Sequence, residues 1–174
     1  MNIHSESVLS FPLDKVYQTY RDRLPEIAAY MPDVKEIRVL SRDDVAGGVK
    51  IHNRWFASAK LPSVAEKVIK PEWMQWDDYA TWDDAQRHVD WHLEIPALGD
   101  QVRCSGRNSF WEADGGTLVR LTGDLQINLQ KLPGMPSFMA KRLVPEVERF
   151  ILRLITPNLQ RVNASLEEFL KQQG

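Results

Sequence analysis

Phe11-Pro12-Leu13-Asp14-Lys15-Val16-Tyr17 decides the fold, because it joins a first strand over residues 2–10 to a helix. Pro12 suits the first turn of a helix, where its missing N–H is not needed. The apolar residues that follow recur at helical spacing up to Tyr20. Leu24-Pro25 ends this helix, and residues 26–30 are expected to form a second short helix.

The middle of the chain predicts an antiparallel sheet, because apolar and polar residues alternate there with the period of a strand. Glycine-containing or acidic turns separate the strands, and Asp114-Gly115-Gly116 is a strong hairpin signal. The expected strands are 34–40, 49–57, 64–69, 73–82, 89–95, 102–113 and 117–129.

The last segment changes to a helical period. Its apolar stripe consists of Val147, Ile151, Leu154, Ile155, Leu159, Val162, Leu166, Phe169 and Leu170. Pro145 is expected in the first turn of this helix. Pro157 is expected to kink the helix or to divide it, with Thr156 capping the second part.

Composition predicts a cytoplasmic protein with one domain over residues 1–174. The chain has 43% hydrophobic and 26% charged residues, as is usual for globular proteins. A net charge of −2 creates no field that would attract nucleic acid. The single cysteine, Cys104, fits a reducing compartment. The N-terminus does not resemble a signal peptide, and no apolar run approaches the ~18 residues that span a bilayer.

The order of these elements resembles the START-like superfamily, whose helix-grip fold is shared with the birch-pollen allergen family and the polyketide cyclases. The resemblance includes Phe11-Pro12, Val16-Tyr17 and Ala28-Ala29-Tyr30-Met31-Pro32-Asp33-Val34, and it extends over nearly the whole chain. It implies an α+β fold in which a curved antiparallel sheet wraps around the C-terminal helix. It also implies a cavity between sheet and helix that often holds apolar molecules. Some members are enzymes, some carriers and some protein-binding co-chaperones, so the resemblance leaves function open.

Two asparagines are the clearest candidates for contact with a ligand. Asn53 alternates in phase with Val49, Ile51 and Trp55, and Asn108 alternates in phase with Cys104 and other apolar residues. Each is therefore expected to face inward, where a buried amide costs roughly 1–3 kcal/mol unless it is hydrogen-bonded. A ligand, water or another side chain could supply the partner.

The leading hypothesis is binding of a lipid, polyketide or quinone-like molecule without a cofactor or metal. Asn53 and Asn108 would orient a polar group of the ligand. The predicted walls are Trp55, Trp91, Phe110, Leu121 and Leu125 on the sheet, and Phe150, Ile151 and Leu154 on the helix.

Residues 132–139 join the last strand to the closing helix and are apolar and proline-rich. Met135, Phe138 and Met139 are predicted to gate the cavity or to make transient contact with a membrane surface. Lys141 and Arg142 follow and could meet phosphate. The alternative is a loop that packs on the sheet.

Catalytic motifs are weak. His88 and His92 would be ~13 Å apart on a strand, too far to share a metal ion. Cys104 lacks a partner for nucleophilic catalysis, and its residue type is usually a core residue. The acidic residues Asp77, Asp78, Asp83, Asp84 and Asp90 are expected on a solvated hairpin.

Two other functions remain open. A cyclase or dehydratase needs an ionisable residue that points into the cavity, and strand alternation offers no good one. A protein-interaction module would use the tryptophan-rich hairpin, residues 73–95, and needs Trp73, Trp76 or Trp82 exposed. The sequence makes no prediction of oligomeric state.

Overall fold

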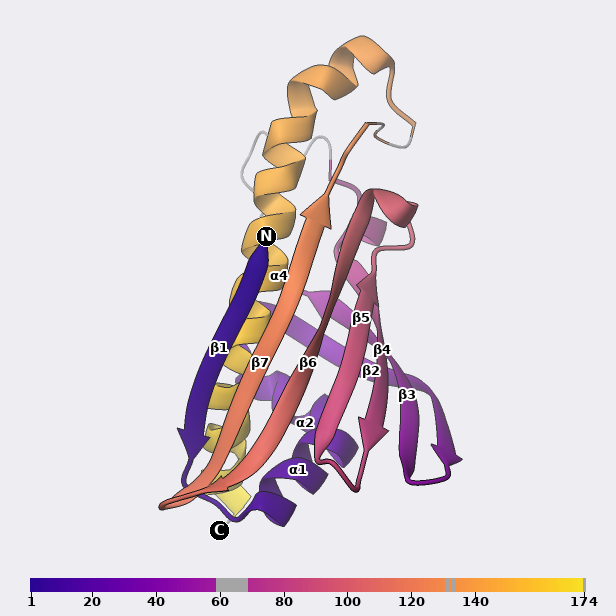
Figure 1. The fold of residues 1–174 in the computed structure, drawn as a ribbon. Helices are drawn as coiled ribbons and strands as arrows, with labels where there is room; N and C mark the ends of the chain where they lie inside the picture. The colour runs from indigo at the N-terminus through magenta and orange to yellow at the C-terminus, as the bar shows by residue number, and fades with distance from the viewer. Residues whose placement is uncertain (59–68, 131, 133, 174) are drawn as a thin grey trace.

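The computed structural model describes residues 1–58, 69–130, 132 and 134–173, and Figure 1 shows a curved sheet with a long helix behind it. Within these residues, seven strands form one antiparallel sheet in the order β1-β7-β6-β5-β4-β3-β2. The strands are β1 (Asn2–Leu9), β2 (Val34–Val45), β3 (Gly48–Ala57), β4 (Gln75–Asp83), β5 (His88–Glu94), β6 (Val102–Ala113) and β7 (Gly116–Ile127).

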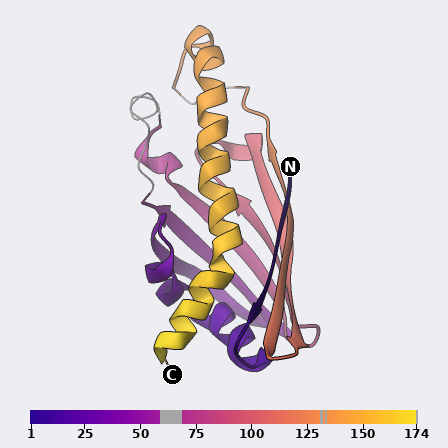
Figure 2. The ribbon, with the colours of Figure 1, turned by 90° about the vertical axis from the view of Figure 1, so that its left-hand side faces the viewer.

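Helices cover the concave side of this sheet. Figure 2 shows α4 lying along the sheet, with the two short helices near its C-terminal end. The helices are α1 (Leu13–Asp22), α2 (Leu24–Ile27) and α4 (Ser137–Gln173), with 3-10 turns η1 (Ala28–Tyr30), η2 (Pro71–Trp73) and η3 (Gly99–Gln101). The predicted α+β class, a curved antiparallel sheet around a C-terminal helix with two short helices after the first strand, is confirmed.

The turns form where the sequence supplies residues that allow them. Gly115 has φ +82°, which side chains disfavour, and Ala113 pairs with Gly116 across the turn. The predicted hairpin at Asp114-Gly115-Gly116 is therefore present. It sets the register of β6 against β7, and that register places Asn108 opposite Leu121.

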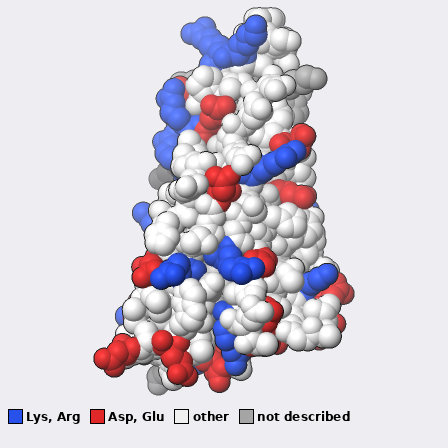
Figure 3. Space-filling view, viewed as in Figure 1, with Lys and Arg blue, Asp and Glu red and all other residues white. Residues whose placement is uncertain are grey.

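The alternation of the strands sorts side chains between a buried concave face and a polar convex face. On β3, Val49, Ile51 and Trp55 are buried. The convex face carries cross-strand ion pairs, including Arg107 with Asp90 at 2.6 Å, and Figure 3 shows acidic and basic side chains interspersed over it. Such exposed pairs contribute little stability individually, so the core contacts hold the sheet against α4.

Helix α4 differs from the prediction in its start, and of the two outcomes expected at Pro157, a kink or a division, the division does not occur. The helix begins at Ser137, so Pro145 lies inside it, and it continues through Pro157 without dividing at Thr156. A proline inside a helix costs about 3 kcal/mol, because one backbone hydrogen bond is lost. Burial of the predicted stripe against the sheet offsets this cost: all of it is buried except Leu159, which is half-buried. Figure 2 shows that α4 bends along its length.

Three strand predictions need adjustment. The strand expected at 34–40 continues to Val45, and the one expected at 73–82 begins at Gln75 because Pro71–Trp73 forms η2. The strand expected at 64–69 falls almost entirely outside the described residues. None of the helices in the described part of the chain combines the length and hydropathy that crossing a bilayer requires.

Candidate functional site

A small cavity lies between the concave face of the sheet and the helices. Strands β3 to β6 form its floor, and α1, α2 and α4 cover it. Its volume is about 40 Å³. That is room for a few water molecules and far below the roughly 300–1,000 Å³ of typical ligand pockets. A larger molecule can enter only if the helices move away from the sheet.

Four tryptophans, Trp55, Trp76, Trp82 and Trp91, line this cavity. The rings of Trp55 and Trp76 stack with their centroids 5.6 Å apart. The rings of Trp82 and Tyr20 pack in an edge-to-face arrangement, with their centroids 5.6 Å apart. Aromatic pairs in these geometries gain attraction beyond simple burial. Flat aromatic rings therefore form much of the cavity wall.

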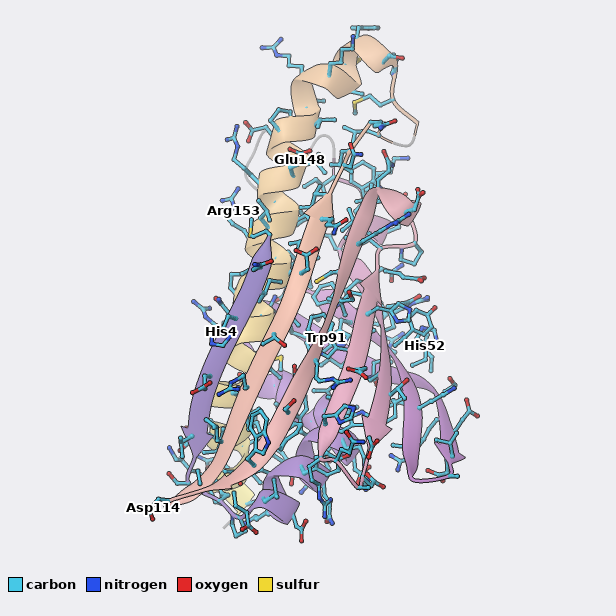
Figure 4. The ribbon with its side chains drawn as sticks, viewed as in Figure 1. His4, His52, Trp91, Asp114, Glu148 and Arg153 are labelled. Carbon is cyan, nitrogen blue, oxygen red and sulfur yellow. The ribbon has the colours of Figure 1, made fainter. Side chains whose placement is uncertain are left out.

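Two glycines let Trp91 lie against the sheet. A Cβ atom on Gly106 would come within 2.5 Å of Trp91 Cζ2, and one on Gly123 within 2.9 Å of Trp91 Cη2. Real side chains do not tolerate such approaches, so only glycine leaves room for this indole. Figure 4 shows Trp91 near the middle of the sheet.

Asp78 is a buried carboxyl group on the same face as the tryptophans. Only 7% of it is exposed. Asn53 Nδ2 donates to Asp78 Oδ2 at 3.2 Å, and Trp55 Nε1 donates to the same oxygen at 3.4 Å. Burial raises the pKa of the Asp78 carboxyl to about 6, and these two hydrogen bonds oppose the shift only in part. At pH 7 most molecules therefore carry a desolvated negative charge beside the cavity.

A second polar network links the sheet to α1. Trp91 Nε1 donates to Asn108 Oδ1 at 2.9 Å, and Asn108 Nδ2 donates to the Tyr20 hydroxyl oxygen at 2.9 Å. Burial and the nearby Asp78 charge raise the pKa of Tyr20, so its hydroxyl stays protonated. Since Tyr20 accepts the bond from Asn108, its O–H remains able to donate into the cavity.

Comparison with solved structures identifies the architecture. The chain is similar to TTHA0849 from Thermus thermophilus, with 20% identity, a TM-score of 0.70 and coverage of 100% of this chain and 99% of that one. It is also similar to the Zhui aromatase/cyclase from Streptomyces sp. R1128, with 16% identity, a TM-score of 0.60 and coverage of 100% and 96%. Ara h 8.0201 has 12% identity, a TM-score of 0.55 and coverage of 99% and 98%. The chain has the helix-grip fold. No protein-family model and no curated protein matches the sequence.

The helix-grip cavity gathers only some of the predicted ligand contacts. Asn53, Trp55, Trp91 and Asn108 line it. The other predicted wall residues are buried but lie outside its lining: Phe110, Leu121, Leu125, Phe150, Ile151 and Leu154. Helix α4 meets the cavity about one turn later, through Ile155, Asn158, Leu159 and Val162. The role of each residue in ligand contact stays a prediction.

The predicted gate lies at the far end of the helix-grip structure. Met135 is half-buried, and Phe138 and Met139 are 76% and 44% exposed. Figure 1 shows the first turns of α4 projecting beyond the end of the sheet. Phe138 is about 25 Å along α4 from Ile155, where the helix meets the cavity. The gate and its contact with a membrane surface stay predictions. The cavity comes nearest to solvent at Arg21 and Leu159, which are half-buried.

His88, His92 and Cys104 were predicted to have no metal-binding or catalytic role. His92 is exposed on the convex face as expected, whereas His88 is 8% exposed in β5, where it is paired with Asp83 on β4 and Ser109 on β6. Burial raises the pKa of the Cys104 thiol to about 12, so the thiol is a poor nucleophile. Among the described residues, no group of three or more His, Cys, Asp or Glu side chains is placed to hold a metal ion.

The prediction that five acidic residues lie on a solvated hairpin is wrong for two of them. Asp77 and Asp78 are 4% and 7% exposed, because both faces of β4 are covered: the convex face by the Arg54 side chain and the concave face by the core.

The predicted patch of exposed tryptophans is also absent, since Trp73, Trp76 and Trp82 are 3–4% exposed. An interaction surface built on those rings is therefore contradicted.

Sequence reasoning missed four polar residues of the cavity: Tyr20, Arg21, Asp78 and Asn158. The signal for Asp78 was present, because it alternates in phase with Trp76 and Trp82. Placing those two rings in the core would have placed Asp78 there too. Asn158 gave no such signal, since it follows Pro157, where a kink or a division of the helix was expected.

Proposed function

We propose that this protein binds an apolar small molecule in the cavity between the sheet and α4. The supporting observation is a set of tryptophan walls that surround a few buried polar groups, the composition that small-molecule sites have. The similarity to the Zhui aromatase/cyclase and to Ara h 8.0201 agrees with a fold that accommodates apolar ligands. The cavity measures about 40 Å³, so a ligand can bind only to a state in which the helices have moved away from the sheet.

Native mass spectrometry after gentle purification tests this function directly. A mass increase that is lost on denaturation is expected, and no bound molecule, together with no cavity expansion in an experimental structure, would refute it. Ala80→Leu supplies a blocking variant, because Ala80 lines the cavity and is 6% exposed. Ala140→Leu is the matched control, since Ala140 is 4% exposed on α4 but does not line the cavity. The Ala80 variant should lose the ligand, and the Ala140 variant should keep it.

A second candidate, cyclase or dehydratase chemistry, gains support from one observation. It needs an inward ionisable group, and Asp78 points into the cavity that Tyr20 also lines. Asp78 as the carboxylate could accept a proton from a carbon next to a ketone, while the Tyr20 O–H donates to the enolate oxygen that forms. Exchange of the α-hydrogens of 2-tetralone in D₂O, followed by NMR, checks this reaction. The rate should fall in Asp78→Asn and stay unchanged in Asp77→Asn; equal rates with and without protein would reject it.

A further inference from the structure

Two buried amide oxygens at the cavity lack a hydrogen-bond donor. Asn53 is 3% exposed and Asn158 is 2% exposed, and neither Oδ1 accepts a hydrogen bond within the described part of the chain. Both side chains line the cavity. Leaving a buried acceptor without a donor costs about 1–3 kcal/mol. The orphaned oxygens therefore mark where a donor from outside the protein would be stabilising.

The orientation of both amides is fixed by their nitrogens. Asn53 Nδ2 donates to the Asp78 carboxylate, and Asn158 Nδ2 donates to the Leu154 carbonyl oxygen at 2.7 Å. Turning either amide over would break that bond and bring two oxygens together. The free atom is therefore an oxygen acceptor in both cases.

Asp78 adds a third acceptor to the same cavity. Both of its hydrogen bonds reach Oδ2, so Oδ1 can still accept. Among the described residues that line the cavity, the one cation is Arg21, and it already binds Asp22 at 2.8 Å and Asp84 at 2.6 Å. His52 lies on the convex face, 3.6 Å from Asp77. The Tyr20 hydroxyl near the Asp78 carboxylate is neutral.

The tryptophans favour the same kind of partner. A cation over the face of tryptophan is attracted by the ring quadrupole, and the attraction grows when water is excluded. Four buried indoles surround this cavity beside a carboxylate. An ammonium group has three N–H donors and no acceptor, which suits a cavity lined by free oxygen acceptors.

We propose that the cavity binds an organic cation whose buried end is a primary ammonium group on an aromatic or other apolar body. This rests on the proposed ligand-binding function and specifies its chemistry. The ammonium donates to Asp78 and Asn53, which are paired across β3 and β4, and the apolar body packs against the indoles. The cost of burying the Asp78 charge is present before the ligand arrives, so only the ammonium loses its hydration on binding. The pair therefore costs less desolvation than an ion pair in which both charges must leave water.

Calorimetric titration with matched amines and alcohols tests the proposal. The probes are 2-phenylethylamine against 2-phenylethanol, and tryptamine against tryptophol, so each pair differs only in the charged group. At pH 7 each amine should bind at least tenfold more tightly than its alcohol. Between pH 7 and pH 5 the amine affinity should fall about tenfold, because Asp78 becomes protonated around pH 6. The alcohol affinity should hardly change.

Variants assign the effect to Asp78. Asp78→Asn should abolish the preference for the amine and retain binding of the alcohol, whereas Asp77→Asn should retain both. An amine preference that survives Asp78→Asn, or equal affinities of amine and alcohol for the unmodified protein, overturns the ammonium assignment and leaves ligand binding intact. Failure of all four probes, with no ligand in native mass spectra, overturns the proposed function as well. If the variant does not fold, the pH dependence of the unmodified protein decides alone.

Discussion

Asp78→Asn should stabilise the free protein at neutral pH. The carboxyl has a pKa of about 6 in the folded chain against 3.8 for the ordinary group. The difference of about 2.2 pH units corresponds to about 3 kcal/mol at 1.36 kcal/mol per unit. Asparagine keeps the shape of aspartate without the charge. After the weakened bonds from Asn53 and Trp55 are subtracted, we expect a net gain of about 2 kcal/mol.

The dependence on pH distinguishes this effect from a packing change. A pKa raised by folding means that the unfolded chain loses its proton first as pH rises. The protein is therefore most stable, as far as Asp78 is concerned, below pH 3.8 and loses that contribution between pH 3.8 and about 6. The advantage of Asp78→Asn should be near zero at pH 4 and complete by pH 7. Urea unfolding followed by tryptophan fluorescence at several pH values measures it.

Asp77→Asn is the matched control, because Asp77 is the next residue on the opposite face. The Arg54 guanidinium, 2.6 Å away, holds the pKa of the Asp77 carboxyl below its usual range. Removing that charge should therefore cost stability at pH 7. If Asp78→Asn also loses stability, or gains it equally at all pH values, the reasoning about a desolvated carboxylate is refuted.

Four further substitutions probe the cavity walls and their support. Asn108→Leu should cost about 2–4 kcal/mol in urea unfolding, because Trp91 Nε1 loses its acceptor and the Tyr20 hydroxyl its donor; Tyr20→Phe, which removes only one of these bonds, should cost less. Gly123→Ala should cost about 1–3 kcal/mol and shift tryptophan emission, because the new methyl group meets the Trp91 ring. Tyr17→Phe should cost about 1 kcal/mol through its lost bonds to the β4–β5 turn, and an unchanged midpoint would contradict this.

Much of the fold could be predicted because its signals are local. The turn at Asp114-Gly115-Gly116 requires a positive φ that glycine supplies, and the two-residue alternation placed Asn53 and Asn108 in the core. Those two residues do line the cavity. The period of a strand thus predicted which face a side chain occupies.

The rest depends on tertiary packing that no short stretch encodes. Both faces of β4 are covered, so Asp77 is buried although alternation places it on the face opposite Trp76 and Trp82, and a hairpin rich in acidic residues looked solvated. Helix α4 passes through Pro157 because its apolar stripe packs against the sheet, which outweighs a local preference to break. The turn of α4 that reaches the cavity is set by the placement of the whole helix, so Leu154 was favoured over Asn158.

The free-energy cost of burying the Asp78 charge and the proposed affinity of the cavity for an ammonium group are thermodynamically linked. An ammonium that binds beside the carboxylate must lower the pKa of Asp78, and by linkage the ligand must stabilise the protein more at pH 7 than at pH 5. A neutral apolar ligand fills the same space without this linkage, so its stabilisation should be nearly equal at both pH values. In Asp78→Asn the free protein starts more stable, and an amine should add no more stability than its alcohol. A carboxylate that destabilises the empty cavity therefore becomes the group that selects the occupant.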